Sequence, residues 1–392
     1  MAIASLPRSV VALGFVSLLM DLSSEMIHSL LPLFLVTILG ASPVAIGIIE
    51  GIAEATAAMV KIFSGTLSDR FQRRKPLILL GYGLAAVSKP LFPLANSVET
   101  VLTARFLDRI GKGIRGAPRD ALIADVTPET QRGAAYGLRQ AMDTMGAFLG
   151  PLTAALLMAT TDDNFHLVFW VASLPALLAV AFILFAVTEP PRSTQTHPSC
   201  TPITLAAARE LPLRFWSILA LAAILALARF SEAFLLLRAE NLGLAATWTP
   251  LVLIAMNLVY AVSAYPFGKG FDSGQRRALL LWGIGFLIVA DLLLALADHF
   301  WFVYVGAMFW GLHMGATQGL LSAWVAENAP HHLRGTAFGL FNLISGVALL
   351  GASTLAGGLW SGIGPKATFL SGAAFATIAA IGLIASRAWQ NR

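Results

Sequence analysis

Ionisable residues interrupt the long apolar stretches of this sequence, and their spacing places several of them on shared helix faces. Asp21, Glu25 and His28 are four and then three residues apart, so in a helix they lie above one another. Glu50 and Glu54 repeat the four-residue spacing. A carboxylate in an apolar environment can take up and release a proton, and a nearby cation changes how readily it does so. The pattern predicts a site that exchanges protons.

Cations concentrate in a later stretch, between residues 98 and 126. Its charged residues include Arg105, Asp108, Arg109, Lys112, Arg115, Arg119 and Asp120. Asp143 follows in the next span, and Arg229 and Glu232 lie three residues apart on one face of a later span. Two interpretations stay open. Either the acids and bases neutralise one another to hold helices together, with Asp108 spaced to reach Lys112, or the cations form a site for an anion.

The composition indicates what surrounds these residues. Apolar residues make up 57% of the 392-residue chain and charged residues only 12%, about half the charged share of a soluble domain. The mean hydropathy is +0.76. So few charges cannot cover the surface of a water-soluble protein of this length, and a membrane is therefore the expected solvent. Cys200 is the only cysteine, which excludes an intramolecular disulfide and a thiolate metal cluster.

Twelve apolar stretches are long enough to span a membrane as helices of roughly 20 residues. They cover residues 9–39, 42–64, 76–95, 98–126, 133–159, 165–188, 213–239, 247–267, 278–297, 300–326, 336–359 and 366–387. The stretch after Arg8 has no small-residue cleavage site before its polar interruption, so we expect it to remain as the first span. The sequence predicts an all-α integral membrane protein with twelve transmembrane helices.

Basic residues are concentrated in alternate loops. One set of loops contains Arg70, Arg73, Arg74, Lys75, Arg132, Arg192, Arg209, Arg214, Arg276, Arg277 and Arg334, and the opposite loops contain Glu99, Asp162, Asp163, Asp298 and a single lysine, Lys366. The positive-inside rule places the first set and both termini in the cytoplasm. The net charge of +5 reflects this topology, so the expected partner is the lipid bilayer of the cell's inner membrane and no nucleic acid is expected.

A proline-rich connection divides the chain. Residues 189–212 contain Pro190, Pro191, Pro198 and Pro202, which break helices. The sequence therefore predicts an N-terminal six-helix bundle over 1–188, a cytoplasmic linker over 189–212 and a C-terminal six-helix bundle over 213–392.

Two loop motifs recur with an offset of about 203 residues. Gly65, Asp69, Arg73 and Arg74 recur as Gly268, Asp272, Arg276 and Arg277, and Asp125 and Arg132 recur as Glu327 and Arg334. Two coincidences with nearly one offset indicate that the halves are related copies of a six-helix unit.

The first of these loops, with Gly65, Asp69, Arg70, Arg73 and Arg74, resembles the signature of the major facilitator superfamily, whose transporters have paired six-helix halves. The resemblance covers the whole chain. It implies that these residues, together with Asp125, Arg132, Asp272 and Arg276, latch the two halves in one orientation. The alternative is that the basic residues only determine topology.

Two further motifs are similar to family patterns. Arg105, followed by glycines, resembles a pattern in which the arginine is associated with proton coupling. Gly146, Gly150 and Pro151 resemble a motif linked to exporters that exchange solute for protons. Alanines 154 and 155 replace its closing glycine pair, which weakens the interpretation as an exporter.

A charge at the centre of a bilayer costs about 3 kcal/mol, so the charges within the spans need a partner or a water-filled cavity. In the second copy the positions of the charged residues of span 98–126 are occupied by Ala307, Trp310, Gly311, Met314, Thr317, Leu321 and Ser322. The helix can therefore form without charges, which favours a functional role. The candidates for proton coupling and the substrate cavity are Asp21, Glu25, His28, Glu50, Glu54, Arg105, Asp108, Arg109, Lys112, Asp143, Arg229 and Glu232. Glu25 or Glu54 is the expected proton acceptor, and Arg105 or Arg109 is its expected cationic partner.

Two functions fit these observations. The first is proton-coupled export of a small organic solute by alternating access, favoured by the glycine-proline motif and Arg105. The second is proton-coupled uptake of an anionic solute or metal chelate, favoured by the excess of cations. An enzyme is not expected, because the sequence lacks a His-Glu-xx-His pair, a Gly-x-Ser-x-Gly turn and a Walker loop. Neither a cofactor nor a resident metal is expected, and we expect a monomer.

Overall fold

The computed structural model describes residues 6–71, 73–128, 131–189, 209–272, 276–330 and 333–385, and within these ranges the chain is helical and contains no strand. Internal contacts divide the chain into two compact units. Unit 1 comprises residues 1–31 and 56–200, and unit 2 comprises residues 32–55 and 201–392. The predicted all-α fold is confirmed.

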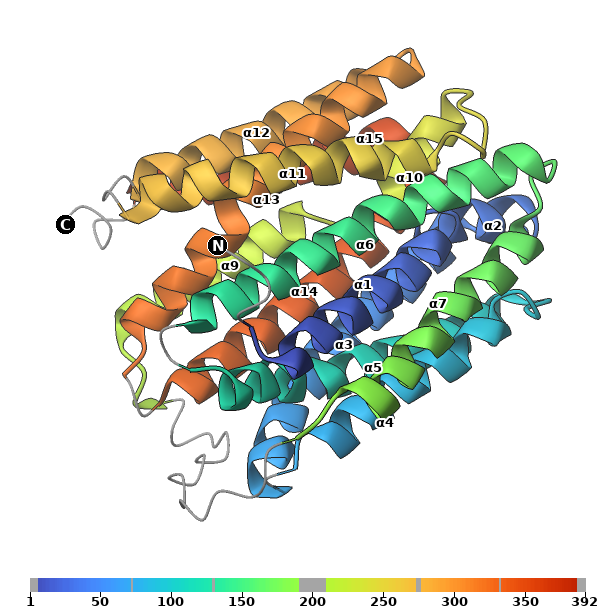
Figure 1. Cartoon of the computed structure of the whole chain (residues 1–392). Helices are drawn as coiled ribbons and strands as arrows, with labels where there is room; N and C mark the ends of the chain where they lie inside the picture. Colours follow the sequence, from blue (N-terminus) through green and yellow to red (C-terminus); the bar gives the residue numbers. More distant parts are fainter. Residues whose placement is uncertain are drawn as a thin grey trace. The chain divides into compact units, whose positions relative to one another are not determined.

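Unit 1 is built on long helices that pack side by side. They are α1 (Arg8–His28), the second part of α3 (Pro43–Phe71), α4 (Lys75–Ser88), the 3-10 helix η2 (Lys89–Leu91), α5 (Val98–Val126), α6 (Arg132–Thr160) and α7 (Phe165–Ala186). Helix α1 packs against α6 and α7, and α4 packs against α5 and α7 (Figure 1). Leu13, Tyr82, Ile123 and Ile183 are among the fully buried residues of its core.

Unit 2 contains the remaining helices. They are α2 (Leu31–Thr37), the first part of α3, α9 (Leu213–Ala228), α10 (Ala233–Asn241), α11 (Pro250–Asp272), α12 (Arg276–Leu296), α13 (Phe300–Asn328), α14 (Arg334–Gly362) and α15 (Pro365–Ala385). Helix α9 packs against α14 and α15, and α12 packs against α13 and α15.

The two units share a packing plan. The pairs α1–α6, α1–α7, α4–α5 and α4–α7 of unit 1 correspond in chain order to α9–α14, α9–α15, α12–α13 and α12–α15 of unit 2. This correspondence is what the sequence repeat leads us to expect. Residues 32–55 group with unit 2 by their contacts, whereas the division at 188 and 213 expected from the sequence stays a prediction. Residues 190–208 of the predicted linker lie outside the described ranges.

The predicted spans 9–39 and 213–239 each contain a break in the helix. Helix α1 ends at His28, and α2 begins at Leu31, just before Pro32, which lacks an N–H group and cannot continue a helical ladder. The break between α9 and α10 has no proline. There, the backbone N–H of Ser231 donates to Oγ of Ser353 at 3.1 Å, and that of Ala233 donates to Oγ of Ser231 at 3.2 Å. Side chains thus replace the helical partners that lipid cannot supply.

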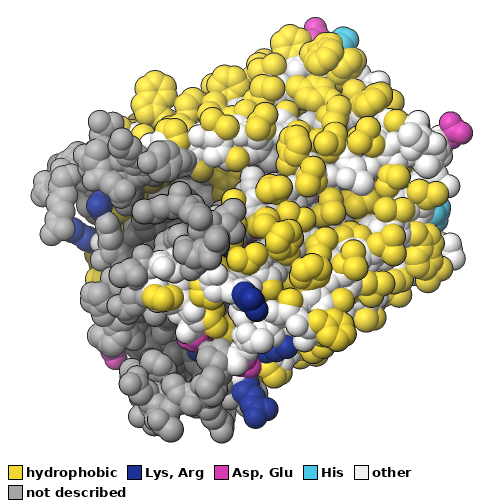
Figure 2. All heavy atoms as spheres, viewed as in Figure 1, with side chains coloured by type: hydrophobic (Ala, Val, Ile, Leu, Met, Phe, Trp, Pro, Cys, Tyr) yellow, Lys and Arg dark blue, Asp and Glu magenta, His cyan; other side chains and the backbone are white. Residues whose placement is uncertain are grey.

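The surface of the described residues is apolar enough for lipid. Phe185 is 87% exposed, Leu213 82% and Ile363 76%, and hydrophobic side chains cover much of the face in Figure 2. Each predicted span is occupied by a helix or a broken helix pair. Eight helical stretches in the described ranges are long and apolar enough to cross a membrane. Helix α5 is not among them, because its charges exceed what an apolar span carries.

Candidate functional site

Two glycines of α6 bring the acidic face of α1 close to the neighbouring helix. A Cβ atom on Gly146 would lie 2.7 Å from the carbonyl oxygen of Leu18 and 2.9 Å from Cβ of Asp21, and one on Gly150 would lie 2.6 Å from Cβ of Glu25. Only glycine permits this approach of two backbones. The motif of Gly146, Gly150 and Pro151 therefore positions Asp21 and Glu25 against α6.

A lysine at the end of α4 holds the charged face of α5. Nζ of Lys89, in η2, donates to Oδ1 of Asp108 at 2.8 Å and to Oγ of Ser24 at 2.9 Å. Nε of Arg109 lies 3.8 Å from the other carboxylate oxygen of Asp108. Lys89, Asp108, Arg105 and Arg109 are all less than 5% exposed. These side chains form a buried cluster from two helical segments, η2 and α5, which we call the Lys89 cluster.

The acids of α1 face further cations of α5. Glu25 lies 3.5 Å from Nδ1 of His28, and Lys112 and Arg109 are close enough to interact with its charge. Asp21 interacts electrostatically with Asp143, Arg115, Lys112 and Arg119. In unit 1 the structure therefore brings together the candidates Asp21, Glu25, His28, Arg105, Asp108, Arg109, Lys112 and Asp143.

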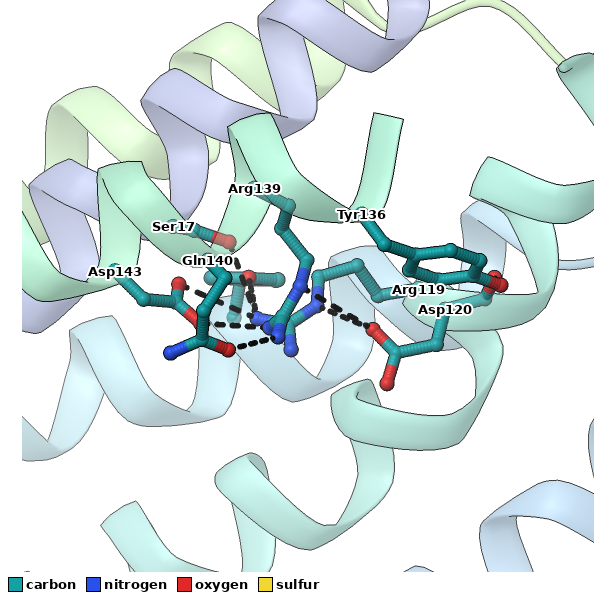
Figure 3. A network of polar contacts seen from close by, with 8 residues as sticks. Ser17, Arg119, Asp120, Tyr136, Arg139, Gln140 and Asp143 are labelled. Atoms are coloured by element: carbon teal, nitrogen blue, oxygen red, sulfur yellow. Dashed lines mark hydrogen bonds and ion pairs between the residues drawn. The ribbon is translucent and has the colours of Figure 1, made fainter. Parts of the chain in front are cut away.

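A second polar network joins α5 to α6 and also contacts α1 (Figure 3). Nη1 of Arg139 donates to Asp143 at 2.6 Å, and Nη1 of Arg119 lies 4.0 Å from the same carboxylate and donates to Oγ of Ser17 at 3.1 Å. Nε of Arg119 donates to Asp120 at 3.2 Å. Because Asp143 has two cationic neighbours within 4.0 Å, it is an ion-pair partner here.

Arg115 has a donor that no described hydrogen bond uses. It is 5% exposed, and its guanidinium carbon lies 4.5 Å from the ring centroid of Tyr82. Its Nη1 has no hydrogen-bond partner among the residues that the structure describes. A buried guanidinium with a spare donor is suited to a carboxylate or phosphate of a ligand.

The remaining candidates lie in unit 2. Arg229, at the end of α9, interacts electrostatically with Glu232, Tyr260 and Glu54, so Glu54 has a cationic neighbour in its own unit. Glu50 is 2% exposed. This group belongs to unit 2, and the pairing of Glu54 with Arg105 or Arg109 stays a prediction.

The expected latch is described only in part. The side chains of Gly65, Asp69, Arg70, Arg132 and Asp272 lie outside the described residues, Arg73 is exposed, and Arg276 begins α12. Arg74 is well placed: Nε lies 3.3 Å from Asp125 and Nη1 donates to Ser68 at 2.5 Å. Its backbone N–H also donates to Glu189. Arg74 and Asp125 thus join the ends of three helical segments of unit 1.

Lys89, Arg139 and Tyr82 are site residues that sequence reasoning missed. Lys89 stands at the end of an apolar stretch beside Pro90, where a lysine is typical of a loop. The sequence did contain a signal for this residue, because Lys89 lies just before one of the loops in which lysine is otherwise rare. Arg139 is four residues before Asp143, the spacing of a helical ion pair.

Comparison with known proteins places this geometry in context. A family model described as Major Facilitator Superfamily matches residues 13–352, with a second match over 233–391. An uncharacterised MFS-type transporter from Methanocaldococcus jannaschii is 32% identical over 97% of this chain and 95% of its own length. Multidrug resistance protein MdtH from Proteus mirabilis is 30% identical over 42% of this chain and 40% of its own. The crystal structure of the nucleoside transporter NupG (D323A mutant) superimposes with a TM-score of 0.83 at 12% identity, over 96% of this chain and 99% of that one.

Proposed function

Because the chain belongs to the major facilitator superfamily, we propose that it is a proton-coupled secondary transporter that exports a small organic solute by alternating access. The observation that carries the proposal is the charged face of unit 1, where half-buried acids of α1 lie beside buried cations of α5. Asp21 and Glu25 lie beside cations of α5, at a glycine-lined contact with α6. The similarity to a multidrug resistance protein supports export as the direction.

The proposed cycle uses the charges of unit 1 as a proton switch. Glu25 is the proton acceptor, with Nδ1 of His28 at 3.5 Å and Lys112 as a cationic neighbour. Protonation removes one negative charge, so those cations are released to bind a solute group or to change partner. Ions buried in a membrane protein are expensive and mark transport pathways. Glu54 with Arg229 is the corresponding acid–base pair proposed for unit 2.

The proposed setting follows from the charge distribution of the loops. We place the protein in the inner membrane as a monomer with both termini in the cytoplasm. Asp69, Arg70, Arg74 and Asp125 form the proposed cytoplasmic latch, of which the contact of Arg74 with Asp125 is described. No catalytic residue, cofactor or resident metal enters the proposal.

A second function, proton-coupled uptake of an anionic solute or metal chelate, is favoured by one specific observation. Arg115 is buried beside the Lys89 cluster with an unused donor. A carboxylate or phosphate group would satisfy this donor and offset the cations around it.

Transport assays with a panel of drugs, metabolites and chelates would test the proposal. In everted vesicles with an acidic interior, an exported substrate should discharge the proton gradient, and Glu25→Gln should abolish the discharge. In right-side-out vesicles, an imported anion should instead accumulate faster at acid external pH. Substrate movement that is indifferent to the gradient in both preparations would refute proton coupling.

A further inference from the structure

A carboxylic acid in unit 2 is buried without any visible compensation. Asp291, on α12, is 0% exposed, and neither of its carboxyl oxygens has a hydrogen-bond partner among the residues described. An ionised carboxylate without a partner is among the least favourable groups to bury, and such a group neutralises instead. The sequence gives no helical spacing that would have singled it out.

The surroundings of Asp291 place it at the break between α9 and α10. A Cβ atom on Gly372 of α15 would lie 2.6 Å from Oδ2 of Asp291 and 3.1 Å from the carbonyl oxygen of Ala228. Both oxygens therefore border the same small space. Ala228 is the last residue of α9, and the final carbonyls of a helix lack a helical N–H partner. An O–H group on Asp291 has an acceptor of this kind within its surroundings.

Charged groups on the neighbouring helices are engaged elsewhere. Nδ1 of His313 on α13 lies 2.8 Å from the carbonyl oxygen of Gly283, and Arg238 on α10 donates to the carbonyls of Leu294 and Ala297. The other titratable or charged groups described on α9 to α13 and α15 are Arg214, Arg229, Glu232, Glu240, Tyr260, Arg276, Arg277, Tyr304 and Lys366.

We propose that Asp291 is a second proton-binding site, in unit 2, whose neutral carboxyl donates a hydrogen bond to the helix end at Ala228. When water reaches the break, the O–H bond opens, the proton passes to water, and the carboxylate remains on α12. The ionised form has no donor to offer the carbonyl, so the break between α9 and α10 loosens. This goes beyond the proposed coupling in unit 1, and its test needs neither substrate nor transport.

The first measurement is the protonation state itself. Infrared difference spectra of the purified protein in lipid nanodiscs should show, at neutral pH, the carbonyl stretch of a protonated carboxyl group. Asp291→Asn should remove this band, and Asp298→Asn, which changes an exposed acid beyond the end of the same helix, should leave it. The absence at neutral pH of any band that Asp291→Asn removes would show that Asp291 is ionised and would overturn the proposal.

The second measurement is hydrogen exchange at the break. The quantity compared is the protection factor of amides 229–235 in wild type, divided by that in Asp291→Asn at the same pH. This ratio should fall about fivefold between neutral and alkaline conditions. That is the effect of losing one hydrogen bond. The asparagine amide keeps a donor at every pH, and the comparison cancels the intrinsic pH dependence of exchange. An equal protection ratio at every pH would refute the link between the proton and the break.

Discussion

The ion pair of Lys89 with Asp108 offers a quantitative test of the buried cluster in unit 1. Nζ and Oδ1 are 2.8 Å apart and the two side chains are 2% and 4% exposed. At that separation two unit charges attract by about 6 kcal/mol with an effective dielectric constant of about 20. Arg109, at 3.8 Å, adds an attraction of about 4 kcal/mol on the same basis. Desolvation opposes both, so breaking such a pair typically destabilises a protein by about 3–5 kcal/mol.

Substitution of Lys89 and substitution of Asp108 should lower the stability of the protein by different amounts. Lys89→Met leaves Asp108 with Arg109 as a cationic neighbour, so we expect a loss near the lower end of the range, about 3 kcal/mol. Asp108→Asn removes the acid that both cations face, so we expect about 5 kcal/mol. The double variant should lose less than the sum, with a coupling energy of about 2 kcal/mol.

Unfolding in mixed micelles of a non-ionic detergent and dodecyl sulfate, followed by tryptophan fluorescence, would measure these differences. Lys61→Met is the matched control, because Lys61 is an exposed lysine of the same unit, and a surface substitution changes stability by less than about 0.5 kcal/mol. If Lys89→Met unfolds at the same detergent fraction as Lys61→Met, or if the coupling energy is zero, the buried cluster is not built as described.

Four further changes test the site and the latch. Glu25→Gln should abolish gradient-driven transport in vesicles without changing the elution profile of the purified protein; normal transport would remove Glu25 from the coupling site. Gly150→Ala should lower stability by about 1–3 kcal/mol, because its Cβ would overlap α1. Gly137 faces open space on the same helix, so Gly137→Ala should leave stability unchanged. Equal melting temperatures of the two variants would contradict the close contact. Asp69→Asn should slow turnover in transport kinetics with little change in substrate affinity, and a large affinity loss at unchanged turnover would argue against a latch. Arg115→Thr should leave the protein folded and lower the affinity for an anionic substrate at least about tenfold, the share of one charge-assisted contact; unchanged anion binding would exclude Arg115.

The helices and their order could be predicted because each leaves a local signal. Long apolar stretches predicted the ranges that the helices occupy, and the repeated loop motifs predicted two related units. Partner choice could not be predicted in the same way. Asp108 is spaced to reach Lys112, yet its described partners are Lys89 and Arg109. The end of α4 packs against α5, and this contact places Lys89, 19 residues earlier in the chain, beside Asp108.

Long-range packing also explains why the surroundings of other charged residues could not be predicted from the sequence. Glu54 lies in the first part of α3, which groups with unit 2, and Arg229 is a cationic neighbour that its sequence position did not reveal; its pairing with Arg105 or Arg109 stays a prediction. Asp291 was missed, although an acid within a predicted span is itself a signal, because a single acid has no spacing that points to a partner. Its isolation becomes visible only when α12, α15 and the end of α9 are seen together.

A comparison of equivalent helix pairs separates packing from function in α5. In unit 1, a Cβ on Gly113 of α5 would lie 2.6 Å from Val60 of α3, and Oγ of Ser64 donates to the carbonyl of Gly113 at 2.8 Å. In unit 2 the pair α11–α13 uses the same device, with Gly315 against Ser263. Small residues and a serine therefore hold both pairs together.

The charges of α5 are an addition to this packing. Where α5 carries Arg105 and Arg115, the repeat places Ala307 and Thr317 in α13, which packs as closely without them. Burying each ion carries a desolvation penalty of several kcal/mol, and unit 2 shows that the helix pair forms without that penalty. Because the packing does not require these charges, they are available for the proposed binding of a proton and a solute.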